Sequence, residues 1–143
     1  MTKNMKLVRQ PEGSGLCLAA CVAMLTGEPL STVMQEGRLL KSEDGVEFLP
    51  DNEAAKFLAG RFLIYGLWLT PQKFDGEETS LQLDLPLDQQ PAILSVDSKT
   101  FKDSEHAVVW DNKRQVVLDP QSDDPKKLGD YSINCWIPIT KIK

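Results

Sequence analysis

A polar loop runs directly into an apolar helix in residues 10–24, QPEGSGLCLAACVAM. Ser14 is placed to cap this helix and Gly27 to end it, which predicts a helix over residues 15–26. Because apolar residues surround the helix axis on nearly every side, we expect it to lie buried at the centre of the fold. Cys17 falls in the first turn, beside the loop, where a substrate can reach its thiol.

The rest of the chain reads as helices followed by strands. Two further helices are predicted over residues 31–40 and 51–60, with Ser31 and Asp51 as their N-caps. Helices that precede a mostly antiparallel sheet define an α+β fold. The buried face of the third helix is predicted to contain Ala54, Ala55, Phe57 and Leu58. The other predicted segments are an extended stretch (1–9), a strand (62–69), a loop (70–90), a strand (91–97), a hairpin (106–120) and a closing segment (131–142) that is either one more strand or irregular.

Length and charge narrow the class of protein. The chain has 143 residues, which predicts a single domain over residues 1–143. Its formal net charge is −5, whereas a surface that follows nucleic-acid phosphates needs clustered Lys and Arg. No apolar run approaches the roughly 20 residues that span a bilayer. We therefore expect neither a nucleic-acid partner nor a membrane span, while the oligomeric state is left open.

Three cysteines, Cys17, Cys21 and Cys135, indicate reduced thiols rather than a disulfide framework. The first residues, MTKNMKLVRQPEG, lack the apolar core of a secretory signal. These features predict a cytoplasmic protein, or an effector delivered by another route. Cys21 and Cys135 are expected to be small buried packing residues.

The single histidine, His106, opens the predicted hairpin. By itself it reads as a surface or capped imidazole. An even-length turn centred between Asn112 and Lys113 would place His106 directly opposite Asp119, with both side chains on one face of the sheet. A carboxylate at that distance accepts the imidazole N–H and stabilises the imidazolium. An odd-length or bulged turn would break this pairing.

Cys17 meets one requirement of a cysteine nucleophile. A helix N-terminus carries partial positive charge, and a neighbouring imidazolium adds to it, so that the thiol pKa falls. Acyl transfer also needs a donor for the developing oxyanion, for which the Gln10 amide and the backbone N–H of Cys17 are candidates.

The order of these residues resembles the papain-like cysteine peptidases of the double-glycine leader type, which form the N-terminal peptidase domains of bacteriocin-exporting ABC transporters and also occur alone. Gln10 and CLAACVAML (17–25) are similar to the first family motif, and HAVVW (106–110) with LDP (118–120) is similar to the second. DGVEFLPDNEAAKFLAG (44–60) and the later PAIL (91–94) follow the family layout. The resemblance covers nearly the whole chain and implies a papain-like α+β fold.

By this resemblance Cys17 is the nucleophile, His106 the base, Asp119 the orienting carboxylate and Gln10 the oxyanion donor. The implied activity is that of a thiol hydrolase, a cysteine peptidase cleaving a peptide or isopeptide bond in a peptide or protein, without metal or organic cofactor. The chain departs from the family pattern where Leu16 and Leu18 replace Asp and Gly, and the Gln-to-Cys separation is one residue longer. The substrate is therefore left open, and a bacterial or phage effector is one source that fits.

The same residues also allow other chemistry. Three cysteines and one histidine can form a zinc site, but the three-residue spacing between Cys17 and Cys21 differs from the usual two. A Cys-His-Asp triad also supports deamidation or acyl transfer, between which the fold does not choose. A non-catalytic peptide-binding module on the same fold is the alternative outside enzymes. GSG at residues 13–15 lacks the Gly-Lys-Ser/Thr ending of a phosphate-binding loop.

Overall fold

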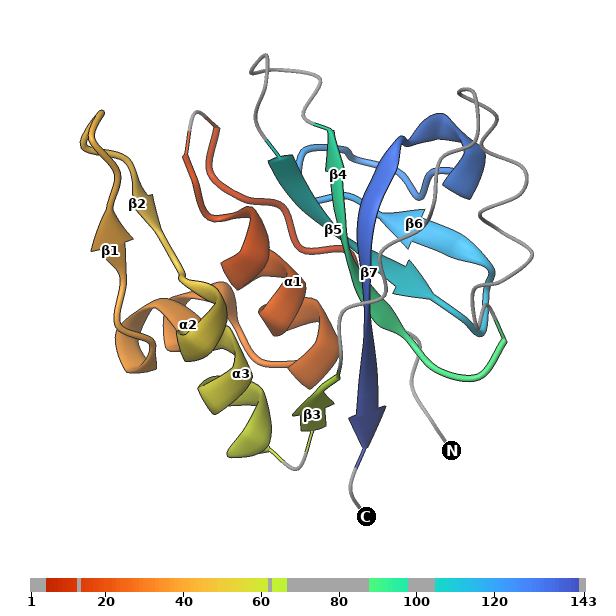
Figure 1. Cartoon of the computed structure of the whole chain (residues 1–143), viewed down its shortest axis with the longest axis horizontal. Coiled ribbons are helices and arrows are strands. Elements are labelled where there is room, and N and C mark those ends of the chain that lie inside the picture. Colours follow the sequence, from red (N-terminus) through yellow and green to blue (C-terminus); the bar gives the residue numbers. More distant parts are fainter. Residues whose placement is uncertain (1–4, 13, 62, 67–87, 98–104, 142–143) are drawn as a thin grey trace.

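Three helices lie on one side of a five-stranded antiparallel sheet in the computed structural model (Figure 1), which describes residues 5–12, 14–61, 63–66, 88–97 and 105–141. The strand order is β3-β7-β4-β5-β6. The α+β prediction is thereby confirmed. The helices are α1 (Cys17–Thr26), α2 (Leu30–Glu36) and α3 (Asp51–Ala59).

All the pairs that the structure describes between neighbouring strands are antiparallel. A second, two-stranded sheet lies beside the helices (Figure 1) and was not anticipated, because its strands are only two residues long. The strands are β1 (Leu40–Lys41), β2 (Glu47–Phe48), β3 (Leu63–Tyr65), β4 (Ala92–Asp97), β5 (Glu105–Asp111), β6 (Val116–Leu118) and β7 (Ile133–Lys141), and a 3₁₀ turn, η1, covers Leu128–Asp130.

Helix α1 is the central element, as the apolar sequence predicts. It packs against α2, α3 and strand β5, and its residues from 18 to 24 are all buried. Gly27 ends it in the left-handed region at φ 76°, where the missing Cβ removes the steric penalty. The N-cap prediction is wrong: Leu16 is the cap residue, while the Ser14 hydroxyl accepts a hydrogen bond from the Leu16 N–H at 3.4 Å.

The caps predicted for the other two helices are also wrong. Helix α2 begins after Pro29 and α3 after Pro50, both with extended backbone, and neither Ser31 nor Asp51 is the N-cap. The fixed φ of proline suits a position that precedes a helix, and its missing N–H costs nothing there. Helix α2 ends at Glu36, so the end of its predicted range belongs instead to β1.

Most other segments agree with the sequence, with shorter boundaries. Residues 5–9 form neither helix nor strand, and residues 1–4 lie outside the described part. The predicted strand over 62–69 is described only at β3, and the loop predicted over 70–90 only from residue 88. On α3, Ala54, Phe57 and Leu58 are buried as predicted, whereas Ala55 is only partly buried.

The hairpin exists, but the predicted register is wrong. The turn covers residues 112–115, so it is centred one residue later than expected. Asp111 explains the shift, because its carboxylate accepts hydrogen bonds from the backbone N–H groups of Lys113 and Arg114 and closes the turn there. The observed pairs are Val109–Leu118, Trp110–Val117 and Asp111–Val116.

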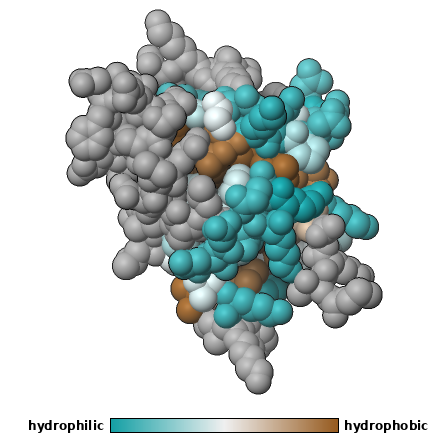
Figure 2. Space-filling model, turned by 90° about the vertical axis from the view of Figure 1, so that its right-hand side faces the viewer, coloured by the Kyte–Doolittle hydropathy of each residue, from teal (hydrophilic) through white to brown (hydrophobic). Residues whose placement is uncertain are grey.

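Apolar side chains fill both faces of the large sheet. One core lies between the helices and the sheet and includes Leu58, Ile93 and Val109. The other lies on the opposite face, where the rings of Trp110 and Trp136 are 6.0 Å apart at their centroids. Figure 2 shows the molecule from the side, with hydrophilic residues over most of the coloured surface and a narrower apolar band between them.

None of the described helices is long and apolar enough to cross a bilayer alone. Helices α1 and α2 pass that test only as a pair, bent by 112° at the break between them.

Leu58→Ala tests the packing of α3 on this core. Leu58 is fully buried, and its loss should lower the free energy of unfolding by about 2–5 kcal/mol, as large-to-alanine changes in cores do. Ile64→Ala is the matched control, since Ile64 is 45% exposed on β3. Urea unfolding followed by circular dichroism measures both. Equal losses in the two variants would contradict the described packing.

Candidate active site

Cys17 is the first residue of α1 and is partly exposed. The loop before it passes directly against β2: a Cβ on Gly15 would lie 2.9 Å from the Glu47 carbonyl oxygen. Such a distance is too short for any real side chain, so glycine is required for this close approach. The loop and β2 together therefore place the thiol at the edge between the helices and the sheet.

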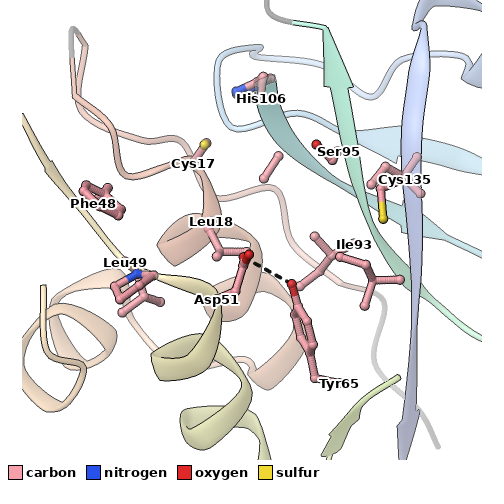
Figure 3. Close-up of a pocket in the computed structure, with 14 residues that line it drawn as sticks. Cys17, Leu18, Phe48, Leu49, Asp51, Tyr65, Ile93, Ser95, His106 and Cys135 are labelled. Atoms are coloured by element: carbon pink, nitrogen blue, oxygen red, sulfur yellow. Dashed lines mark hydrogen bonds between the residues drawn. The ribbon is translucent and has the colours of Figure 1, made fainter. Parts of the chain in front are cut away.

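His106 is the second residue of β5, and its side chain follows the strand's alternation. It lies on the same face as Val108 and Trp110, opposite to the face that α1 covers. It still reaches Cys17, because it sits at the start of the strand, beside the N-terminus of α1 (Figure 3). The imidazole Nε2 lies 2.7 Å from Asp119 Oδ1.

The pairing of His106 with Asp119 thus forms despite the wrong register. The observed register, continued to Asp119, places it opposite Val108, two residues along β5 from His106. Asp119 is therefore a diagonal neighbour of His106, not its direct partner. A shift by two residues keeps every side chain on its original face, whereas a shift by one would have reversed them. Diagonal neighbours remain within reach of long side chains such as imidazole and carboxylate.

Asp119 is held by three donors. Oδ1 accepts from the His106 ring and from the backbone N–H of Gln121 at 2.8 Å, and Oδ2 accepts from the Tyr131 hydroxyl at 2.7 Å. Burial raises the pKa of the Asp119 carboxyl, but these hydrogen bonds and the imidazolium charge lower it below its ordinary value overall. The carboxylate therefore stays ionised beside the ring.

Sequence reasoning missed Tyr131. It lies beyond η1, outside the hairpin, and nothing in the local pattern YSINCW distinguishes it from a core tyrosine. It reaches Asp119 because the chain after β6 folds back, with Val117 bridged to Lys126 in antiparallel fashion. Burial and the neighbouring carboxylate raise the Tyr131 pKa, so the hydroxyl remains a donor.

Cys17 and His106 form a coupled pair. Burial raises the pKa of the Cys17 thiol, but hydrogen bonds from His106 and from the backbone N–H of Ala107, with the imidazolium charge, lower it overall. For His106, burial lowers the pKa, whereas its bonds to Asp119 and Cys17 raise it to about 9. Because Nε2 faces Asp119, Nδ1 is the nitrogen left to face the thiol. Near neutral pH this arrangement favours thiolate and imidazolium.

Gln10 lies next to this network but is already engaged. Its backbone N–H donates to the Pro120 carbonyl at 2.9 Å, which ties the N-terminal loop to the segment that carries Asp119. The side-chain Nε2 donates to the Ser14 carbonyl at 2.8 Å and to the Ser14 hydroxyl at 3.5 Å, and Oε1 is buried without a hydrogen-bond partner. Both contacts of the Gln10 amide nitrogen therefore hold the loop that leads to Cys17, and the weaker one, to the Ser14 hydroxyl, is the one that an oxyanion would replace.

Cys21 and Cys135 are both buried. Burial, followed by the charges of Cys17 and Asp119, raises the pKa of Cys21 well above its ordinary value, so this thiol is unreactive. No group of three or more His, Cys, Asp or Glu side chains suited to a metal ion is found among the described residues.

A cavity of about 470 Å³ opens beside Cys17 (Figure 3). Helices α1 and α3, the β2–α3 connection, and strands β2, β3, β4, β5 and β7 contribute its walls. Its described lining is mostly apolar, with the thiol and the imidazole at one end. The described lining residues are Cys17, Leu18, Phe48, Leu49, Pro50, Asp51, Tyr65, Ile93, Leu94, Ser95, His106, Ala107, Cys135 and Ile137.

Three helices packed on an antiparallel sheet in this order have the α+β fold of a papain-like domain. A solved structure with the same fold is a double glycine motif protease from an AMS/PCAT transporter, in complex with the leader peptide. The two chains share 16% sequence identity at a TM-score of 0.59, over 99% of this chain and 96% of the other. The fold implied by the sequence resemblance is confirmed. No protein-family model and no curated protein matches the sequence.

The pKa of His106 can be measured without assignment ambiguity, because the chain contains one histidine. We expect its imidazole ¹H resonances to titrate near pH 9. In Asp119→Asn the pKa should fall, since the charged partner is lost, and in Tyr131→Phe by less, since the carboxylate remains. A wild-type value near the ordinary 6.5 would contradict the hydrogen-bonded network.

The same shift predicts a dependence of stability on pH. Because the folded state holds the His106 proton more tightly than the unfolded chain, this stabilisation is fully present below pH 6.5 and is lost as pH rises through about 9. Asp119→Asn should flatten this part of the profile, which urea unfolding at each pH measures.

Proposed function

We propose that this protein is a cysteine peptidase that cleaves a peptide or isopeptide bond through Cys17, His106 and Asp119. The observation that carries the proposal is the single imidazole joined to the thiol on one side and to a buried carboxylate on the other. A structural packing role for these residues needs no such chain of hydrogen bonds. The likeness in fold to a double glycine motif protease supports the same chemistry.

In the first half of the proposed reaction, the Cys17 thiolate attacks the carbonyl carbon of the substrate. The backbone N–H of Cys17 and the side-chain amide of Gln10 donate to the oxyanion that develops. The His106 imidazolium then donates its proton to the leaving nitrogen, the C–N bond breaks, and an amine and a thioester remain.

In the second half, neutral His106 takes a proton from water, and the hydroxide attacks the thioester carbonyl. The C–S bond breaks, the acid product leaves, and the thiolate and imidazolium are restored. Asp119 keeps the imidazolium oriented and charge-balanced throughout, and Tyr131 and the Gln121 N–H hold Asp119 in turn. An amine in place of water would give acyl transfer, so the product analysis must distinguish the two.

Cys17→Ala should abolish turnover, whereas Cys21→Ala should retain it, because the Cys21 thiol is buried and unreactive. The measurement is cleavage of a peptide mixture by each purified variant, read by mass spectrometry. Circular dichroism verifies that both variants are folded. Turnover that survives in Cys17→Ala would rule out the assignment.

The pH dependence of turnover follows from the two coupled groups. The low-pH limb should report protonation of Cys17, at a pH below the ordinary thiol value of 9.0. The high-pH limb should fall through about pH 9, as His106 loses the proton that the leaving nitrogen needs. The alkylation rate of Cys17 by iodoacetamide should show the low limb alone. In His106→Ala that limb should move upward, and an unmoved limb would contradict the coupled pair.

A further inference from the structure

The cavity beside Cys17 is lined by apolar and by ionisable side chains (Figure 3). Cys17 and His106 lie at one end, and Asp51 and Tyr65 lie across the cavity from them. Most of the other described lining side chains are apolar, among them Leu18, Phe48, Leu49, Ile93 and Ile137.

Asp51 is the one carboxylate among the described residues that line this cavity. It is the first residue of α3 and is exposed, where the helix N-terminus favours its negative charge. The Tyr65 hydroxyl lies 3.3 Å from its Oδ1, which leaves the carboxylate room to accept further donors. Burial and then the charge of Asp51 raise the pKa of Tyr65, so the tyrosine remains neutral beside it.

The wall that carries Asp51 belongs to a segment with more carboxylates than cations, although only Asp51 among them lines the cavity and Glu53 is paired with Lys56 at 3.8 Å. From β1 through α3, residues 41–56 contain five carboxylates and two lysines, whereas His106 lies on the far side of the cavity. A wall with this charge attracts a cation and repels an anion that approaches the cleft. The carboxylates are Glu43, Asp44, Glu47, Asp51 and Glu53, and the cations are Lys41 and Lys56.

We propose that the cavity binds a lysine or arginine side chain of the substrate, on the acyl side of the bond that Cys17 attacks. The aliphatic stem packs on Phe48 and Ile93, and the cationic head donates to the Asp51 carboxylate. A purely apolar side chain would pack against the apolar lining but would give the Asp51 carboxylate no new hydrogen-bond donor. This inference rests on the proposed peptidase function and adds to it a class of substrate.

Peptidyl acyloxymethyl ketones test the proposal, because they alkylate an activated cysteine at a rate that reports binding of their side chains. Lysine, norleucine and glutamate are compared at the first and at the second residue on the acyl side. Norleucine keeps the lysine stem without its charge. We expect the lysine probe to label Cys17 at least tenfold faster than norleucine at one position, with glutamate slowest. Rates for norleucine that equal or exceed those for lysine at both positions would overturn the proposal.

Two substitutions locate the preference. Asp51→Asn keeps the shape of the side chain and should reduce the ratio of lysine to norleucine rates about tenfold. Asp44→Asn is the matched control: it removes one negative charge from the same wall, in the β1–β2 turn, outside the cavity lining, and should keep the ratio. An equal fall in both variants would assign the preference to the general field instead of Asp51. Because the wild-type ratios are measured first, the proposal stays open to refutation even where Asp51→Asn fails to fold.

Alkylation by iodoacetamide distinguishes an activated Cys17 thiol from a preference for basic side chains. Rapid alkylation of Cys17 by iodoacetamide near neutral pH, together with no preference for the lysine probe, would refute the basic specificity and leave the peptidase proposal standing. Slow alkylation by iodoacetamide, unchanged in His106→Ala, would refute the activated thiol and with it both proposals.

Discussion

The hydrogen bond between His106 and Asp119 is the interaction on which the candidate site depends. It fixes which ring nitrogen faces the thiol, and it allows the imidazole to remain protonated while buried. An isolated buried imidazolium would lose its proton because burial disfavours charge. Here the carboxylate, itself held by Tyr131 and the Gln121 N–H, offsets that penalty. The imidazolium that lowers the pKa of Cys17 therefore depends in turn on the hydrogen bonds that hold Asp119.

The fold serves this interaction by bringing together elements that are distant in the sequence. Helix α1 brings the thiol to the edge of the sheet, and its apolar surface is the centre of the larger core. The hairpin of β5 and β6 supplies imidazole and carboxylate on one face, and the returning chain adds the tyrosine. The Gly15 approach to β2 then sets one wall of the cavity. In α1, for example, the first residue supplies the thiol and the following residues form the core.

Sequence reasoning recovered the parts of this arrangement that local patterns determine. The apolar run of α1 and its glycine stop predicted the helix, and alternation around the Asp111 turn predicted a hairpin. The exact register depended on side-chain bonds from Asp111 to the turn, which no apolar pattern encodes. The two side chains still meet because the strand pairing is shifted by two residues, which leaves both on the same face of the sheet. Tyr131 depends on a contact with a residue on another element, and strands β1 and β2 are only two residues long, so neither feature could be predicted from the sequence.

The reactivity of Cys17 depends on whether the chain has folded. The thiol comes from residue 17, while the groups that activate it come from residues 106, 119 and 131, which lie on β5, directly after β6 and before β7 and meet only when these strands have paired. During synthesis, and after any unfolding, Cys17 is an ordinary thiol with no imidazolium beside it. Reactivity is thus a property of the completed sheet, and a growing chain on the ribosome carries no activated nucleophile until its C-terminal third has emerged.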